Sequence, residues 1–550
     1  MYKFILIFLF LFTSNIYVYS QRTKKIPPDQ PKLVVLIVVE QMRYDFLAKY
    51  WKKFSENGFK RLLTEGTTCT NARYNYLFNH SSCGHTTIAS GASPSAHGIV
   101  ADNWLNRVTN KMVNCVYDTE YQTIGGTGIV GKASPVRMLT STFADEINIA
   151  NAGKSKIIGI SLRPEPAILS TGHCADACYW FNDSTGNWIT SSYYQNQLPE
   201  WVNQFNAKKF PDLYQERSWT PLLPYTEYTE SLEDNLNYEI GIDNNKVFPY
   251  DLKILFEKYK DYRFLRKTPY GINLTKDFAL SAIVNEELGK DDITDFLCIS
   301  FASTGYVSDL FGTTSLEIED TYLRLDKELA HLLEFIDNTP GKENTLLLLT
   351  SDRGSANPNA YMKALRMPTG EFNSTSSIAL LNTYLKAIYG TGNWISAYKD
   401  QQIYLNQNLI EDSKLKPEEV ENTAARFMVQ FSGVSHALTA SALQSTTFND
   451  ATLRKIQLSY HPKFSGDVLF MLAPGWVAIE PDITQTEIVS HNSGYEYDTH
   501  VPLLWYGWKI PKKEINRSID MTDIAPTISN LLKVPFPNAA TGSLIYELTE

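Results

Sequence analysis

Five short, nearly uninterrupted apolar runs constrain the fold of this chain more than any other feature. A strand with one face in water alternates apolar and polar residues, whereas a strand covered on both faces is apolar throughout. The runs therefore predict strands buried on both faces of a parallel sheet. They are Leu33–Val39, Ile157–Leu162, Phe296–Phe301, Leu346–Leu349 and Val501–Tyr506.

Helical patterns lie between these runs. From Ile318 to Ile336 the apolar residues are spaced for one face of a helix, and Thr522 to Leu532 predicts a second helix with Pro526 near its first turn. Strands that alternate with helices predict the α/β class, with a doubly wound, mostly parallel sheet flanked by helices.

Two regions interrupt this alternation. Residues from about 178 to 273 are rich in Tyr, Trp, Asn and Pro, and residues from about 373 to 461 hold a β-like stretch, a helix and a Ser/Thr/Ala segment. We interpret both as insertions over the C-terminal edge of the sheet, where α/β proteins place their ligands. The expected organisation is one domain over residues 21–550 with these two insertions.

The N-terminus predicts export. Lys3 precedes an apolar run from Phe4 to Phe12, and Val18 and Ser20 fit a cleavage site before Gln21. Residues 1–20 are therefore expected to be a signal peptide, which places the protein in the periplasm or outside the cell. No later stretch approaches the roughly 18 apolar residues of a membrane helix, so no transmembrane segment is expected after cleavage.

Composition and charge argue against one class of function, the binding of nucleic acids. The chain of 550 residues is 43% hydrophobic and 20% charged with a net charge of −10, which is typical of a globular protein. A nucleic-acid-binding protein usually has a basic stripe, and no run of Lys or Arg here is long enough to form one. We therefore expect no nucleic-acid partner.

Polar segments follow the predicted strands, where this fold class carries its chemistry. Longer strings then identify a resemblance. They include Gly84-His85-Thr86, the run from Glu319 to Asp326, the run from Tyr497 to Leu504, and Met521 to Thr527. Over residues 32–550 the chain resembles the phosphate-irrepressible alkaline phosphatases, a branch of the alkaline phosphatase superfamily related to type I phosphodiesterases and nucleotide pyrophosphatases.

The resemblance implies phosphate monoester hydrolysis at a centre of two zinc ions about 4 Å apart. A Thr or Ser attacks phosphorus, and the nucleophile position falls on Ser81. His80 beside it is a possible base. A loop histidine without a catalytic role is the simpler interpretation of His80.

The metal positions implied by the resemblance are only partly kept. Asp352 and His491 keep the expected residue types, and Glu40 and Asp309 are carboxylates that could still bind a metal. Gly305 and Arg353 replace ligands, because glycine has no side chain and a guanidinium has no free lone pair. The sequence predicts either no metal or one divalent ion, such as zinc, rather than an ordinary two-zinc site.

The phosphate-contacting positions have changed too. They fall on Asp102, where the family has Asn, and on Arg163 and Glu165, where the family has a Lys-x-Arg pair. Together the Asn-to-Asp and Arg-to-Glu changes make the pocket three charge units more negative, so a phosphate dianion would meet repulsion.

These departures favour a catalytically impaired pseudo-phosphatase with a binding or scaffold role in the cell envelope. In this interpretation Arg353 lies between Glu40 and Asp352 and replaces a zinc ion electrostatically. The partner would be an envelope protein, a glycan or a phosphorylated ligand, contacted through the aromatic-rich insertions. The alternative is a metal-dependent phosphoric-ester hydrolase with an altered centre that uses Ser81 as nucleophile.

Overall fold

A central sheet organises the protein in the computed structural model, which describes residues 27–479, 487–489 and 491–549. The expected signal peptide, residues 1–20, lies outside the described residues. The strand order in the described sheet is β20-β2-β19-β12-β1-β11-β6-β7-β8-β5, and β21 also pairs with β2. The strands are β1 (Leu33–Val39), β2 (Thr67–Arg73), β5 (Thr123–Ile124), β6 (Ile157–Ser161), β7 (Ala177–Asn182), β8 (Asn187–Ser191), β11 (Asp295–Phe301), β12 (Thr345–Thr350), β19 (His500–Gly507), β20 (Lys513–Ile515) and β21 (Ile519–Asp520).

The middle of the sheet is parallel, as predicted. β1 pairs in parallel with β11 and β12, and β6 pairs in parallel with β11 and β7. The prediction of a parallel strand was wrong for Val501–Tyr506, because β19 runs antiparallel to both β12 and β2. A central strand covered on both faces is apolar whichever way it runs, so its residue pattern carries no direction.

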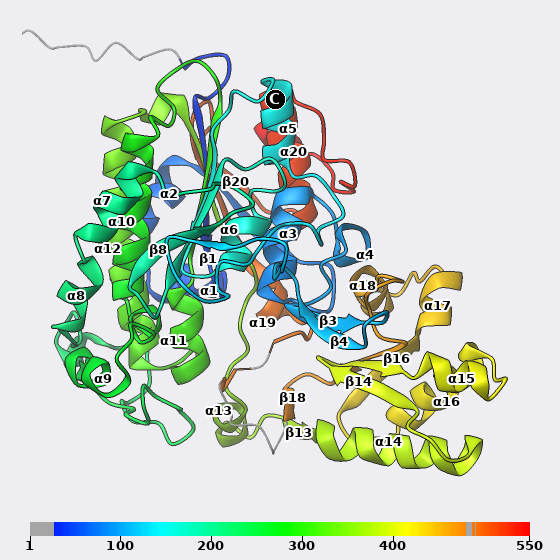
Figure 1. Cartoon of the computed structure of the whole chain (residues 1–550). Helices are drawn as coiled ribbons and strands as arrows, with labels where there is room; N and C mark the ends of the chain where they lie inside the picture. The colour runs from blue at the N-terminus through cyan, green and yellow to red at the C-terminus, as the bar shows by residue number, and fades with distance from the viewer. Residues whose placement is uncertain (1–26, 480–486, 490, 550) are drawn as a thin grey trace, which may run out of the picture.

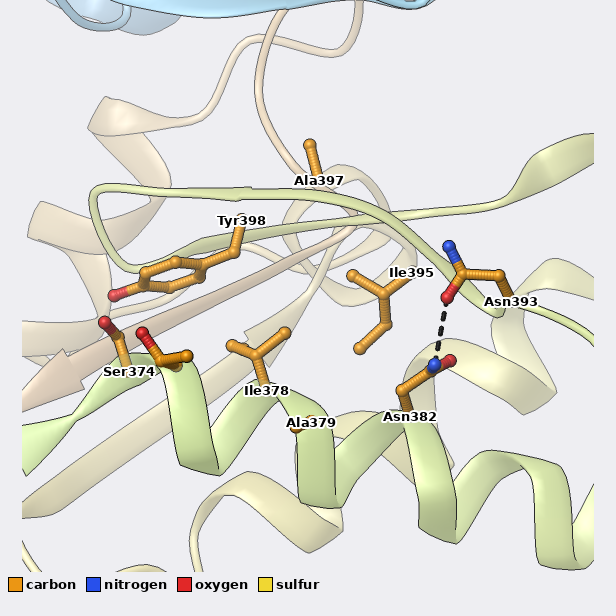
Figure 2. Close-up of a pocket in the computed structure, with 9 residues that line it drawn as sticks. Ser374, Ile378, Ala379, Asn382, Asn393, Ile395, Ala397 and Tyr398 are labelled. Atoms are coloured by element: carbon orange, nitrogen blue, oxygen red, sulfur yellow. Dashed lines mark hydrogen bonds between the residues drawn. The ribbon is translucent and has the colours of Figure 1, made fainter. Parts of the chain in front are cut away.

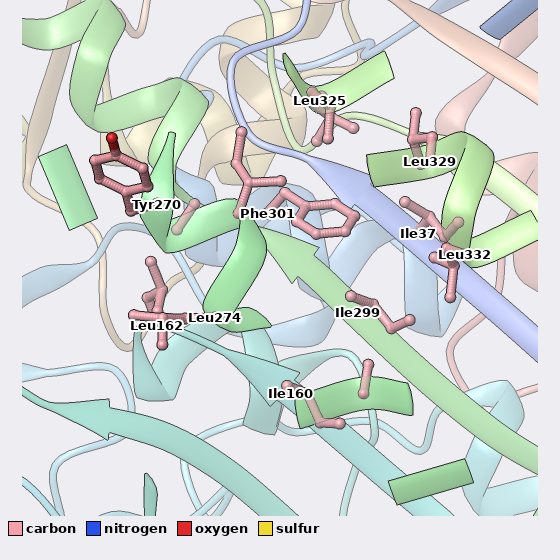
Figure 3. Close-up of a cluster of buried hydrophobic side chains, with 14 of the residues drawn as sticks. Ile37, Ile160, Leu162, Tyr270, Leu274, Ile299, Phe301, Leu325, Leu329 and Leu332 are labelled. Carbon is pink, nitrogen blue, oxygen red and sulfur yellow. The ribbon is translucent and has the colours of Figure 1, made fainter. Parts of the chain in front are cut away.

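Helices cover both faces of the sheet (Figure 1). One layer contains α10 (Tyr270–Asn285) and α12 (Leu316–Asn338), and the other contains α3 (Ser81–Ser90), α5 (Phe143–Ala150) and α20 (Ile524–Leu532). Alternate residues of β1 enter two separate clusters of buried apolar side chains. Figure 3 shows the first cluster, in which Ile37 and Ile299 of the sheet lie near Leu329 and Leu332 of α12. The predicted doubly wound class is confirmed.

The two predicted helices are also present. α12 begins after its N-cap Ser315, whose side chain accepts a hydrogen bond from the Ile318 N–H, and it buries the predicted apolar face. The second helix is split into a short 3₁₀ turn (Met521–Asp523) and α20, with Pro526 in the first turn. Proline is tolerated there because the first turn has no intrahelical partner for its missing N–H.

The first predicted insertion, 178–273, begins inside the central sheet, since β7 and β8 are two of its strands. The remainder forms α7 (Glu200–Ala207), α8 (Phe210–Gln215), β9 (Ser218–Trp219), β10 (Tyr250–Asp251) and α9 (Leu252–Tyr259). Its aromatic residues join the core beside α10, where Trp188 stacks on Phe278 at 4.3 Å between ring centroids. The aromatic residues of this segment therefore pack against α10 and form part of the core on that face of the sheet.

The second predicted insertion, 373–461, belongs to a lobe that we define as residues 370–479. The lobe contains a four-stranded sheet, β14 (Ile395–Lys399), β15 (Gln402–Leu405), β17 (Val468–Leu472) and β16 (Val434–Thr439), with α14 (Ser374–Tyr389) and α16 (Pro417–Met428). It has its own cluster of buried apolar residues, and a smaller cluster joins it to Leu77 and Phe78 of the main body. Among the described helices, none combines the length and apolar character needed to cross a bilayer.

Candidate active site

Four neighbouring strands deliver the predicted site residues to one edge of the sheet. Glu40 follows β1, Arg163 follows β6 and Asp352 follows β12, while α11 (Ser303–Phe311) begins just after β11 and carries Gly305 and Asp309. The strands β12, β1, β11 and β6 are adjacent and parallel, so their carboxyl ends meet. The sheet topology therefore brings these residues to one edge of the sheet.

Ser81 reaches the same edge as the first residue of α3. That helix is buried along its whole length, and its glycine approaches the Asp352 backbone closely. A Cβ at Gly84 would lie 1.9 Å from the Asp352 carbonyl oxygen, so only glycine allows this contact. The Gly84-His85-Thr86 string thus sets how near Ser81 lies to the end of β12.

Arg163 connects the nucleophile position to the carboxylate after β1. Its Nη2 donates hydrogen bonds to Ser81 Oγ at 2.7 Å and to Glu40 Oε2 at 2.8 Å. The other Glu40 oxygen accepts a hydrogen bond from Ser300 Oγ at 3.2 Å. Burial raises the pKa of Glu40 to about 7, against the attraction of Arg163, which lowers it. Arg163 therefore engages both the nucleophile position and a metal-ligand position.

Gln41, which was not predicted from the sequence as a site residue, forms hydrogen bonds with two carboxylates of the site. Its backbone lies in the left-handed region with φ of 60°, which is uncommon outside glycine. The Gln41 N–H donates to Asp352 Oδ1 at 2.9 Å, and Nε2 donates to Asp309 Oδ1 at 2.8 Å. Such backbone conformations concentrate at functional sites, but nothing in a single sequence signals them.

Arg353 is buried at this edge but makes a different contact from the one expected. Its Nη1 donates to the Asn79 carbonyl oxygen at 3.4 Å, whereas the guanidinium paired with Glu40 belongs to Arg163. Burial would lower the pKa of Arg353, but attraction from Asp352 and Asp309 raises it. Arg353 thus stays charged and acts on the carboxylates through its electrostatic field, while Arg163 makes the ion pair.

Asp309 and His491 come together with a third group, Glu487, that was not predicted from the sequence. His491 Nε2 lies 3.4 Å from Asp309 Oδ1 and 4.0 Å from Glu487 Oε2. The three ligand atoms lie within 4.8 Å of one another. Burial, followed by the charge of Arg353, lowers the pKa of His491 to about 3.

The acidic residues at the two changed phosphate-contacting positions each accept a hydrogen bond from a neighbouring group. Asp102 Oδ1 accepts a hydrogen bond from the Ser82 N–H at 3.2 Å, and Glu165 Oε1 accepts one from Asn114 Nδ2 at 3.3 Å. Burial would raise the pKa of Asp102, but attraction from His80 and Arg163 holds it well below its usual range. Asp102 is therefore an anion at neutral pH.

His80, the possible base, is placed between two carboxylates. Its Nδ1 lies 3.9 Å from Asp102 Oδ2, and its Nε2 lies 3.5 Å from Asp400 Oδ2. Asp400 stands between β14 and β15, so the lobe contributes a residue to the edge of the site. This contact favours a role for His80 in joining the lobe to the site.

The donor set does not fit a two-zinc centre. Gly305 offers no side chain, Arg353 offers no lone pair, and Glu40 is engaged by Arg163. Asp352 Oδ2 is buried without a hydrogen-bond partner among the described residues. Carboxylates outnumber the guanidinium groups of Arg163 and Arg353 around the site; they belong to Glu40, Asp102, Glu165, Asp309, Asp352 and Glu487.

A separate pocket of about 400 Å³ lies in the lobe, between α14 and β14 (Figure 2). Tyr398, Ile378 and Ile395 supply its apolar lining. Two of its amides already bond within the protein: Asn382 Nδ2 donates to Asn393 Oδ1 at 2.9 Å, and Asn382 Oδ1 accepts from the Trp394 N–H at 2.9 Å. None of the predicted site residues lines this pocket.

Comparison with known proteins decides the family. The family described as type I phosphodiesterase / nucleotide pyrophosphatase matches residues 34–496. The chain belongs to this family. It is 38% identical to the alkaline phosphatase PafA of Elizabethkingia meningoseptica over 533 residues, which cover 96% of each chain. It is 35% identical to the alkaline phosphatase PhoV of Synechococcus elongatus, over 94% of this chain and 93% of that one.

The fold agrees with that of the family. The structure matches the crystal structure of wild-type PafA with a TM-score of 0.90 at 38% identity, covering 95% of this chain and 99% of that one. The resemblance to the alkaline phosphatase superfamily is therefore confirmed. The roles of the individual site residues remain predictions.

Proposed function

We propose that this protein is an exported member of the alkaline phosphatase superfamily that has lost ordinary phosphatase chemistry and binds a partner in the cell envelope. One observation carries the proposal. Arg163 donates to Ser81 Oγ at 2.7 Å and to Glu40 Oε2 at 2.8 Å, so one guanidinium engages both the nucleophile position and a ligand position. A serine that accepts a hydrogen bond from a cation is a poorer nucleophile, because the cation withdraws electron density from its oxygen.

The charges around Ser81 support the same conclusion. Asp102 and Glu165 stand where the resemblance places neutral and positive phosphate contacts. A transferred phosphoryl group needs positive charge where its own negative charge develops. This site offers carboxylates there, so it would bind neither a phosphate ester nor another phosphorylated ligand well. An envelope protein or a glycan is the better partner class.

Export is part of the proposal and rests on residues 1–20, which precede the described chain. Cleavage before Gln21 would leave a mature protein in the periplasm or outside the cell. N-terminal sequencing of the protein recovered from the native envelope or medium checks this, and an intact Met1 would contradict it.

The catalytic part is tested with p-nitrophenyl phosphate and a phosphodiester at mildly alkaline pH with added zinc. The full mature chain and its Ser81→Ala variant are compared, with PafA as the positive control. We expect both chains to show only background turnover. Turnover that disappears in Ser81→Ala would overturn the proposal and establish the alternative, an ester hydrolase with an altered centre.

A further inference from the structure

We propose that Asp309, Glu487 and His491 hold one divalent transition-metal ion, zinc in the first instance, with Glu487 as a ligand that the resemblance does not assign. The inference goes beyond the proposed function and does not depend on it, because a single bound ion is compatible with a protein that lacks turnover. It shares the Asp309 and His491 positions with the two-zinc arrangement that the resemblance implies, and it differs in the number of ions and in the ligand Glu487.

The geometry carries the proposal. Around a tetrahedral zinc ion with bonds of about 2.1 Å, neighbouring ligand atoms lie about 3.4 Å apart. His491 Nε2 and Asp309 Oδ1 are 3.4 Å apart, and His491 Nε2 and Glu487 Oε2 are 4.0 Å apart. A small rotation of the Glu487 side chain, which is half exposed, would close the remaining difference.

The surroundings hold the three groups in place. The Ile488 N–H donates to the Asp309 carbonyl oxygen at 2.9 Å, which fixes the Glu487 segment against α11. Gln41 Nε2 donates to Asp309 Oδ1 at 2.8 Å and orients that carboxylate. His491 is almost fully buried and directs Nε2 toward the two carboxylates. Outer contacts of this kind orient ligands and strengthen metal binding.

Glu487 supplies a carboxylate near the place where Gly305 lacks one. Gly305 and Asp309 lie one turn apart on α11, and a Cβ at Gly305 would lie 3.4 Å from Gln41 Nε2, the same atom that bonds Asp309. A side chain at position 305 would therefore lie beside this cluster. One imidazole and two carboxylates form a donor set that zinc accepts, with a charge that balances a divalent ion.

The competing arrangement is electrostatic. The charge of Arg353 acts on both Asp309 and Glu487 and could balance them without a metal. A single ion could also be held by Glu40, Asp309, Asp352 and His491 together. The three arrangements predict different effects of single substitutions, so metal stoichiometry distinguishes them.

The experiment measures zinc content and affinity, with no reference to activity. The mature protein is stripped with EDTA and titrated with zinc chloride by calorimetry, and its metal content is then measured by elemental analysis. We expect one zinc per chain. Glu487→Gln should weaken binding at least tenfold and His491→Ala should abolish it, because each removes a ligand. Circular dichroism confirms that each variant is folded.

Two controls sharpen the result. Glu496→Gln alters an exposed carboxylate that pairs with Arg73 outside the cluster, and it should bind zinc as the wild type does. Glu40→Gln should also leave binding unchanged if the ion lies at the three proposed ligands. Zinc binding that is absent, that reaches two ions, that survives Glu487→Gln or that is lost in Glu40→Gln would overturn the inference. The zinc content does not determine the result of the turnover assay, so either proposal can be contradicted while the other stands.

Discussion

At the scale of single residues, Arg163 and Gln41 determine what the site can do. Arg163 pairs with a carboxylate that is almost fully buried, and Gln41 links Asp309 to Asp352. A buried carboxylate that loses its ion-pair partner must either take up a proton or carry a poorly compensated charge. The protonation state of Glu40 therefore depends on Arg163.

Replacing Arg163 tests this dependence. Arg163→Met should destabilise the protein by about 1–3 kcal/mol at pH 7.5, because it removes the ion-pair partner of the buried Glu40 carboxylate and leaves the hydrogen bond from the Ser300 hydroxyl. Urea unfolding measures the change. The double variant Arg163→Met, Glu40→Gln should recover much of the loss, since it removes both charges. Equal stability of the single and double variants would show that the pair is not coupled.

At the scale of elements, the sheet edge and the segment between β9 and β10 both concentrate acidic groups. In that segment Glu239 accepts a hydrogen bond from the Leu236 N–H at 3.1 Å, and Tyr250 donates to Glu317 of α12 at 2.5 Å. Burial, followed by repulsion from Asp234, raises the pKa of Glu239 to about 8. Glu239 is therefore largely protonated in the folded state at neutral pH.

The raised pKa of Glu239 predicts a pH-dependent stability. The folded state keeps its proton up to a pH near 8, whereas the unfolded chain releases it near 4.5, so stability is lost as pH rises between these values. Glu239→Gln cannot lose a proton, so its stability relative to the wild type should grow by up to about 1.4 kcal/mol per pH unit across this interval. Urea unfolding at a series of pH values measures it. The exposed Glu371→Gln variant serves as control, and a difference between wild type and Glu239→Gln that does not change with pH would contradict the assignment.

At the scale of the whole molecule, one sheet with two cores carries a lobe with a core of its own. The lobe meets the main body through a small apolar cluster, the Asp400–His80 contact and the Arg107–Asp467 ion pair, among other contacts. A part that has a hydrophobic core of its own can open separately from the rest of the molecule. The lobe is therefore expected to have its own local stability.

A pair of tryptophan variants tests this expectation. Trp394 and Trp505 are both fully buried, the first in the lobe core and the second in β19 of the central sheet. Trp394→Ala should destabilise the lobe by about 3–5 kcal/mol, and hydrogen exchange should accelerate in residues 370–479 but not in β1. Trp505→Ala should accelerate exchange in the central sheet. Equal acceleration throughout the chain in both variants would show that the protein opens as one unit.

Local sequence patterns were enough to predict the fold class, most of the strands and the long helix. Uninterrupted apolar runs and a regular helical face are local patterns, and burial on both faces of the sheet leaves few other arrangements. Motif strings placed Ser81, Glu40, Asp309, Asp352 and His491 at candidate positions, and the parallel topology brings them to one edge.

The direction of β19, the place of β7 and β8 in the sheet, and the choice of the arginine that pairs with Glu40 follow from contacts made in the folded chain. Folding also brings Glu487 to His491 and Asp309. Strand direction and ion pairing depend on contacts between residues far apart in the chain, and no local pattern records them. The sequence alone shows which metal-ligand positions have changed. The side chains that lie beside those positions, such as Arg163 and Glu487, come together only by folding, at the edge of the sheet where the strands end.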